Sequence, residues 1–295
     1  MERVKSEALD AILGQEFKVL DKGFIRVVDY MGNDEAIVQA ARTSYGKGLE
    51  TPTKDRGLVR YLMRHRHESP FEQCMIKLHV KLPITVARQW IRHRTAKVNE
   101  ESARYTIVQN EFYIPSPERL RLQSVNNKQG SSDEVVSDAE VWHEMFQDTP
   151  DICHVNYNSA IKAGIAKEIS RVLLPESRYT QWYWTIDLRN LFNFLLLRKD
   201  VHAQEEIRLY ADVIGDIVEQ WVPWAWEAFV DYRLEAVTLS RMEFKLVSSL
   251  LHVDWDRENL LALFDGEGYE SVSQKEMTKE GMSKREINEF LEKFQ

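Results

Sequence analysis

The sequence has few cysteines and no surplus of positive charge. Only two of its 295 residues are cysteines, Cys74 and Cys153, and no CxxC spacing occurs. This pattern suggests neither a disulfide framework nor a zinc site, so a reduced, cytoplasmic setting is expected. The formal net charge of -8 argues against the spread basic surface that nucleic-acid and membrane-surface binding usually require. Any anion site must therefore be local.

Long hydrophobic runs are also missing. No segment approaches the roughly 20 apolar residues that a membrane-spanning helix needs. The N-terminal stretch MERVKSEALDAILGQEF carries Glu2, Glu7 and Asp10 and lacks the apolar run of a signal peptide. We therefore expect neither export nor a membrane partner. Hydrophobic residues nevertheless make up 43% of the chain, which is enough for the core of a globular protein.

The first half of the chain mixes helical and strand patterns. Asn33 can cap a helix through residues 36–45, and residues 53–66 show helical spacing again. Residues 75–82, MIKLHVKL, alternate apolar and polar side chains as a half-buried strand does. Pro83 fits the first turn of a helix over residues 84–94. The stretch 106–120 is predicted to be extended.

The second half is predicted to be mainly helical. Helical patterns cover residues 141–146 and 158–174, Asp187 can cap a helix over 188–198, and Asp200 can start a long helix through residue 221. The polar residues 123–138 are interpreted as a surface loop insertion. In the charged tail, Ser240 with Glu243 and Ser283 with Glu286 form capping boxes, which predict short helices.

Positive charge is concentrated in one segment, RHRTAKVNEESARY, which begins at Arg92. On a helix over 84–94, Gln89, Arg92 and His93 would share a face while Arg94 would point nearly the opposite way. That arrangement suits two anionic ligands on two sides of the helix.

Beyond a bend, an extended chain would place Glu100, Ser102 and Arg104 on one face. An acceptor, a hydroxyl and a two-pronged cation in a row could bind a nucleotide. The alternative is a helix in which Glu100 and Arg104 form an ordinary i,i+4 ion pair. The residues alone leave both interpretations open.

Three further clusters also allow two interpretations. In HRHESPFE, Ser69 and Glu72 make a capping box, yet the same turn, beside two histidines, could bind phosphate. In RVLLPESRYTQWYW, Arg171 precedes aromatic residues that belong more often to a core than to a cofactor site. In LRNLFNFLLLRKDVH, Arg189 with Asn193 and Arg198 with His202 have i,i+4 spacing. Such buried arginines need an anionic ligand or a carboxylate, for example that of Glu205 or Glu206.

A metal site is the weaker interpretation of the histidines. His65, His67, His93, Asp200 and His202 could be assembled into a site like that of a metal-dependent phosphohydrolase. However, HxH and DxH are weak patterns, and the neighbouring arginines oppose cation binding. We therefore expect no metal. A nucleotide- or RNA-binding regulator without catalysis is the other alternative.

Taken together, these segments resemble the flavin-dependent thymidylate synthases, known as ThyX. The signature is RHR, then seven residues, then Ser102, and here it stands within ARQWIRHRTAKVNEESARY. RYLMRHRHESPFE precedes it, while FYIPSPERL, RVLLP and LRNLFNFLLLRKDVHAQEEI follow in the family's order. The similarity covers roughly residues 15–235.

The resemblance implies an α+β fold with a single catalytic domain over residues 1–237. A mixed, largely antiparallel sheet would be packed by helices, and residues 238–295 would form a helical extension of unknown role. It also implies a homotetramer with active sites shared between subunits. FAD would be the cofactor, and dUMP, methylenetetrahydrofolate and NADPH the small-molecule substrates of a reaction that makes dTMP.

The resemblance also implies roles for individual residues. Nucleotide contacts are expected from Gln89, Trp90, Ile91, Arg92, Glu100, Glu101, Ser102, Ala103, Arg104, Arg171 and Arg198. Flavin contacts are expected from Ser69, Arg92, His93, Arg94, Glu100, Asp187, Leu188, Arg189 and Asn193, with His67 and His202 as further candidates. Arg198 is the expected catalytic residue, favouring ionisation at N3 of the uracil. Ser102 is assigned to binding, because the segment offers no obvious histidine base to activate it.

Some residues depart from the commonest family pattern. Lys97, Glu101, Gln73 and Asp187 stand where many members have other residues, although no signature arginine is missing. An additional carboxylate at Asp187 would repel a flavin pyrophosphate unless it were paired, for example with Arg189.

Overall fold

The structure is a computed structural model that describes residues 4–43, 46, 48–125 and 127–242. The chain divides into two compact units, Met1–Ala236 and Val237–Gln295. The capping boxes expected at Ser240 with Glu243 and at Ser283 with Glu286 involve residues outside the described part. Within that part, no helix is long and apolar enough to cross a membrane.

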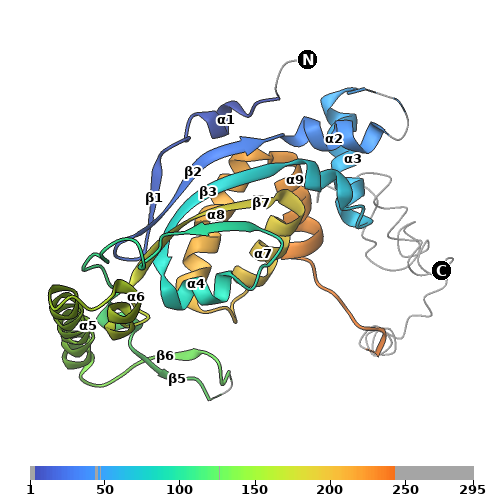
Figure 1. Ribbon diagram of the computed structural model, residues 1–295. Helices are drawn as coiled ribbons and strands as arrows, with labels where there is room; N and C mark the ends of the chain where they lie inside the picture. The colour runs from blue at the N-terminus through green and yellow to red at the C-terminus, as the bar shows by residue number, and fades with distance from the viewer. Residues whose placement is uncertain (1–3, 44–45, 47, 126, 243–295) are drawn as a thin grey trace. The chain divides into compact units, whose positions relative to one another are not determined.

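A five-stranded antiparallel sheet forms the centre of the first unit (Figure 1). Its order is β1 (Glu16–Val19), β2 (Gly23–Met31), β3 (Met75–Pro83), β7 (Tyr179–Asp187) and β4 (Lys97–Glu100). All four strand pairings are antiparallel. The largely antiparallel sheet that the family resemblance implied is confirmed.

Alternation along the strands separates a buried face from an open one. In β3, Ile76, Leu78, Val80 and Leu82 are buried, as the sequence pattern predicted. The aromatic run on β7 behaves in the same way, because Trp182 and Trp184 are buried while Tyr183 between them is exposed. The prediction that these tryptophans belong to the core is therefore confirmed.

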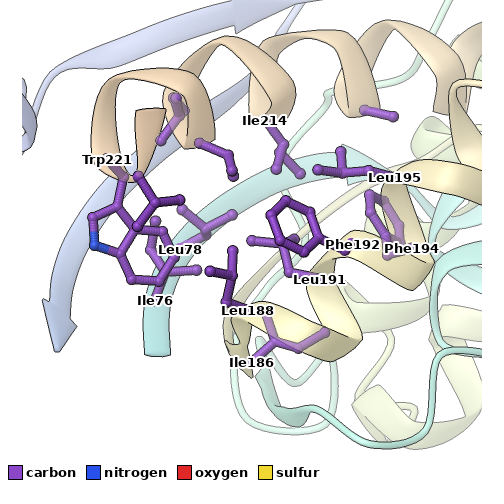
Figure 2. Close-up of a cluster of buried hydrophobic side chains, with 14 of the residues drawn as sticks. Ile76, Leu78, Ile186, Leu188, Leu191, Phe192, Phe194, Leu195, Ile214 and Trp221 are labelled. Carbon is purple, nitrogen blue, oxygen red and sulfur yellow. The ribbon is translucent and has the colours of Figure 1, made fainter. Parts of the chain in front are cut away.

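Two helices cover the buried face of the sheet, α7 (Leu188–Arg198) and α8 (Glu205–Trp221) (Figure 1). Figure 2 shows Leu191 and Leu195 of α7 directed toward Leu78 of β3 and Ile214 of α8. These four side chains are fully buried, and burying each such side chain contributes about 1.5–3 kcal/mol. The α-helices of this unit also include α1 (Glu7–Asp10), α2 (Asp34–Arg42), α3 (Pro52–Arg64) and α9 (Pro223–Phe229). A single π-helical turn, Val230–Leu234, follows α9.

Two caps expected from the sequence are present. The Asn33 side chain accepts a hydrogen bond from the Ala36 N–H, which begins α2. The Asp187 side chain accepts one from the Asn190 N–H at 3.0 Å, which begins α7. Each satisfies a backbone donor that the first helical turn leaves free.

Two expected helix boundaries were wrong. The helix α4 (Ile84–Trp90) ends before the RHR segment, because the chain must turn so that Lys97 can pair with Thr185 of β7. The long helix α8 begins at Glu205 rather than at Asp200. The Asp200 carboxylate is instead occupied by the backbone N–H and the ring of His202.

Three further differences lie after residue 105. Residues 123–138 are not entirely loop, because β5 (Arg121–Gln123) and β6 (Ser131–Val135) pair as a hairpin. One helix, α5 (Ala139–Lys162), runs through Pro150 where two shorter helices were expected, and α6 (Lys167–Ser170) and the 3₁₀ turn Arg171–Leu173 follow. Residues 106–120 are mostly irregular, with one bridge at Phe112 and a 3₁₀ turn at Pro117–Arg119.

Gly23 provides a test of how tightly α8 packs on the sheet. A Cβ atom at this position would lie 2.0 Å from the Tyr210 hydroxyl and 2.8 Å from the Lys81 carbonyl oxygen. We expect Gly23→Ala to lower the free energy of unfolding by about 1–3 kcal/mol. In the control Gly57→Ala, on α3, the new methyl meets nothing within 4 Å. The free energy of unfolding of that variant should rise by about 0.5–1 kcal/mol. Urea unfolding measures both, and equal stabilities would contradict this packing.

Candidate active site

The helix α7 presents two expected flavin contacts to a pocket. Leu188, Leu191 and Leu195 are buried, so Arg189 and Asn193 emerge on the opposite side of the helix. Both line a pocket of about 230 Å³, whose other lining residues are Met63, Glu68, Phe71, Phe192, Leu196, Phe229 and Arg233. Aromatic walls with arginines at their edge suit a flat ligand that carries negative charge.

Glu68 connects the two arginines of this pocket. One of its carboxylate oxygens accepts a hydrogen bond from Arg189 Nε at 2.8 Å, and the other accepts one from Arg233 Nη2 at 2.7 Å. Sequence reasoning missed both Glu68 and Arg233, which lie 165 positions apart. Asp187 does not pair with Arg189 as suggested, because its carboxylate binds the Asn190 backbone and side-chain amides.

The capping box expected at Ser69 is absent. Ser69 lies inside a five-residue 3₁₀ helix, Ser69–Gln73, whose N-cap is Glu68, and no side chain caps it. The Glu68 carboxylate is directed to the two arginines and makes no capping hydrogen bond. Nearby, His65 and His67 pack around Tyr61, with ring centroids 4.3 Å and 5.8 Å from the tyrosine ring.

Arg198, at the end of α7, has two neutral hydrogen-bond partners within the described residues. Its Nε donates to His93 Nε2 at 3.1 Å, and its Nη2 donates to the Gln89 carbonyl oxygen at 3.2 Å. The suggested carboxylates do not serve it, because Glu205 and Glu206 bind arginines from residues 119–121 instead. In the part of the chain that is described, no carboxylate lies within ion-pair distance of Arg198. Burial therefore lowers the pKa of this guanidinium without compensation from a negative charge.

His93 is held neutral by the same contact. Burial and the adjacent Arg198 charge lower the pKa of His93 to about 4. Nε2 therefore accepts the Arg198 hydrogen bond, and the ring proton lies on Nδ1. His202 does not share this site, because α7 ends at Arg198 and the His202 ring binds Asp200.

The RHR segment lies in the turn after α4, so the expected division of its side chains between two helix faces was wrong. Arg92 and Arg94 are exposed, and no hydrogen bond or ion pair holds either side chain within the described residues. Two unpaired guanidinium groups in a turn are suited to binding anions. Ile91 beside them is half-exposed, whereas the Trp90 ring is fully buried against Phe194 and Trp184. Trp90 and Leu188 are both fully buried, so neither presents an exposed side chain to a ligand.

Neither interpretation of the segment after Lys97 was right. The strand stops at Glu100, whose carboxylate accepts a hydrogen bond from the Thr180 hydroxyl at 2.7 Å. The chain then turns, because the Ser102 carbonyl oxygen accepts hydrogen bonds from the backbone of Tyr105 and Thr106. The expected row of Glu100, Ser102 and Arg104 on one extended face is thus broken.

Arg104 and Arg171 meet at Glu168. Arg104 Nη2 lies 3.3 Å from the Glu168 carboxylate, and Arg171 Nε donates to the Glu168 carbonyl oxygen at 3.3 Å. The i,i+4 ion pair of Arg104 with Glu100 is therefore also absent. Ala103 is buried beside them, and Glu101 accepts a hydrogen bond from the Thr106 hydroxyl.

The candidate residues of one chain thus form three groups. The first surrounds Arg189, the second surrounds Arg198 with the RHR turn, and the third surrounds Arg104 with Arg171. Lys97 is exposed on β4. Among the residues that the structure describes, no three His, Cys, Asp or Glu side chains are placed to hold a metal ion.

Comparison with known proteins gives a consistent family. The family model described as thymidylate synthase complementing protein matches residues 26–224. A flavin-dependent thymidylate synthase of Wolbachia pipientis wMel is 56% identical over 245 residues, covering 82% of this chain and 86% of that protein. The protein of the same name from Ruegeria pomeroyi is 53% identical over 244 residues, covering 81% of this chain and 80% of its own length.

A solved structure shares the fold. The UMP/dUMP methylase PolB from Streptomyces cacaoi, bound with 5-Br dUMP, has a TM-score of 0.66 and 33% identity. The match covers 72% of this chain and 97% of PolB. The fold of helices on an antiparallel sheet is therefore that of a thymidylate synthase-like protein. More specifically, the chain belongs to the flavin-dependent thymidylate synthase family.

The lowered pKa of His93 has a consequence for stability. Between pH 4 and pH 6.5 the unfolded chain binds a proton at His93 that the folded chain does not bind, since the folded pKa is about 4. Stability should therefore fall as the pH decreases through this window, and His93→Asn should make that fall shallower. NMR titration of the flavin-free protein and unfolding at several pH values measure this. A His93 pKa near 6.5 would contradict the contact with Arg198.

Proposed function

We propose that this protein is a flavin-dependent thymidylate synthase that methylates dUMP to dTMP. Methylenetetrahydrofolate would donate the carbon and leave as tetrahydrofolate, and NADPH would reduce the bound FAD. When bound, the flavin supplies the hydride that completes the methyl group. The observation that carries the proposal is the half-buried Arg198, whose hydrogen-bond partners among the described residues are both neutral.

Arg198 would act on the uracil ring. Its hydrogen bonds to His93 and Gln89 use two of its N–H groups and fix the plane of the guanidinium. The remaining donors can hold the uracil N3 and stabilise the negative charge that forms when N3 loses its proton. Because His93 is neutral, it orients Arg198 without competing for that charge.

The residues present fit the phosphates of dUMP and FAD. Arg92 and Arg94 are exposed and unpaired in the described part of the chain, so both can bind phosphate oxygens. Arg189 and Asn193 would hold the flavin beside the aromatic walls of their pocket. Arg104 and Arg171 would add nucleotide contacts when a phosphate, with its stronger negative charge, replaces Glu168 as their partner.

No covalent enzyme nucleophile is part of this proposal. The Ser102 hydroxyl oxygen accepts a hydrogen bond from the Arg104 backbone N–H at 3.3 Å. Within the described residues, no histidine forms a hydrogen bond with this hydroxyl to serve as its base. Ser102 is therefore assigned to nucleotide binding.

The arrangement into three groups supports a site shared between copies of the chain. We propose a homotetramer in which the groups of one subunit complete sites with those of its neighbours, and a cytoplasmic setting. Analytical ultracentrifugation of the flavin-loaded protein tests the tetramer. A monomer that retains full turnover would contradict shared sites.

A tritium-release assay tests the activity. Tritium should leave C5-labelled dUMP only when methylenetetrahydrofolate, NADPH and FAD are all present. Nucleotide binding without flavin retention or NADPH oxidation would instead support a regulatory protein. Loss of activity on chelation would support a metal-dependent phosphohydrolase.

Arg198 should affect turnover far more than cofactor binding. We expect Arg198→Ala to lower kcat by about 100-fold or more, because a fixed donor to a developing anion is lost. Its FAD content should stay near that of the unchanged protein. Arg208→Ala is the control, since Arg208 on α8 donates to the backbone carbonyl oxygen of Val201, away from the Arg198 contacts. Equal losses of turnover and flavin would make Arg198 structural.

We also propose that residues 1–237 form the catalytic domain and that residues 238–295 are peripheral to it. A chain ending at Val237 should then remain folded and bind FAD as the full chain does. Circular dichroism and the ratio of flavin to protein absorbance measure both properties. Insoluble or flavin-free protein would contradict this division.

A further inference from the structure

A buried carboxylate outside the expected site residues is linked through Gln204 to Gln89, one of the expected nucleotide contacts. Glu206, in the first turn of α8, is only 4% exposed. One of its oxygens accepts hydrogen bonds from the Tyr113 hydroxyl at 3.0 Å and from Arg119 Nε at 2.8 Å. The other accepts from Arg119 Nη2 at 3.1 Å and from Gln204 Nε2 at 2.6 Å. Four donors therefore surround one buried anion.

Glu206 stays ionised in this environment. Burial opposes its negative charge, but the hydrogen bonds and positive charge of Arg119 outweigh burial and lower the pKa of Glu206. Burial and the Glu206 charge raise the pKa of Tyr113, so its hydroxyl remains a donor. An ionised carboxylate can only accept hydrogen bonds.

This restriction sets the direction of the next two hydrogen bonds. The Gln204 amide must turn its nitrogen toward Glu206, so its carbonyl oxygen Oε1 points away. That oxygen accepts a hydrogen bond from Gln89 Nε2. If the Gln89 amide were flipped, two carbonyl oxygens would face each other. The orientation of Gln89 is thus determined by a carboxylate that it does not touch.

Two further observations fit this use of Gln204. Gln204 occupies the N-cap position of α8, yet its side chain makes no capping hydrogen bond and is directed to Glu206 and Gln89 instead. Gln89 is also held from its main chain, because its carbonyl oxygen accepts the hydrogen bond from Arg198. Side chain and main chain of Gln89 are therefore fixed independently.

We propose that Gln204, held by Glu206 and Arg119, is a positioning residue that fixes the Gln89 amide for nucleotide binding. The inference rests on the proposed function, which supplies the contact between Gln89 and dUMP. It also gives the β5–β6 hairpin a role, because Arg119 binds Ser131 of β6 and Arg121 binds Glu205. The hairpin therefore braces the arginine that orients Glu206.

The test uses Gln204→Met in the full-length protein loaded with FAD. Methionine has a similar length but no amide, so Gln89 loses the acceptor that orients it. We expect the KM and the Kd for dUMP to rise by about tenfold, the effect of one hydrogen bond. Both kcat and FAD content should stay within about twofold. A purely structural role would instead lower kcat, flavin content and thermal stability together.

Two comparisons make the test specific. Gln220→Met is the matched control, because it is the same exchange on α8 and the Gln220 amide donates to the Asp216 carbonyl oxygen, outside the hydrogen bonds of Glu206. This variant should keep the KM for dUMP unchanged. In a Gln89→Met background, adding Gln204→Met should cause no further rise in the Kd, since coupled residues are not additive. A further tenfold rise there would show that Gln204 does not act through Gln89, and would overturn the inference.

Direct titration of dUMP separates the two proposals. If the unchanged protein binds and converts dUMP while Gln204→Met binds it equally well, the positioning role is wrong and the enzyme function stands. If the unchanged protein neither binds nor converts dUMP, the proposed function is wrong and the positioning role falls with it.

Discussion

The burial of one side of α7 between the sheet and α8 is the constraint on which the site depends. Leu188, Leu191 and Leu195 are fully buried, so the helix cannot rotate without exposing them. A rotation by one residue would turn the helix by about 100° and would carry Arg189 toward the core. Losing these apolar contacts would cost about 1.5–3 kcal/mol for each side chain. Packing therefore fixes where Arg189 and Asn193 emerge and where Arg198 ends the helix.

Charged side chains in this fold differ in whether they have an oppositely charged partner. Where a charge supports the structure, it has an opposite partner, as in the buried pair of Arg42 with Asp55 at 2.7 Å and in Glu206 with Arg119. Arg198 has neutral partners, and in the described part of the chain Arg92 and Arg94 have none. On a protein of net charge -8, cations without a carboxylate partner indicate a local site for anionic ligands. Arg189 and Arg104 do not follow this contrast, because they pair with Glu68 and Glu168 although a ligand role is proposed for both.

The sequence predicted the features that depend on local pattern. The alternation of β3, the caps at Asn33 and Asp187, and the buried Trp182 and Trp184 are all confirmed. The quoted sequence motifs also indicated the right family. Each of these signals lies within a few neighbouring residues, where periodicity and capping chemistry act.

Features that depend on distant partners could not be predicted in this way. The end of α4 at Trp90 is set by the pairing of β4 with β7, in which Lys97 lies opposite Thr185, a residue far along the chain. Glu206 and Arg119 are separated by 87 positions, so no spacing rule connects them. Residues 121–135 have a polar composition typical of a loop, yet they form a hairpin. The hydrogen bonds of Arg119 and Arg121 that hold this hairpin can be seen only in the three-dimensional structure.

The visible absorption spectrum of the purified protein tests the central claim most directly. The account predicts an oxidised flavin spectrum that changes when dUMP is added, because it proposes that the nucleotide and the flavin bind next to each other. A protein that stays colourless after incubation with FAD would contradict the account. So would a flavin spectrum that saturating dUMP leaves unchanged.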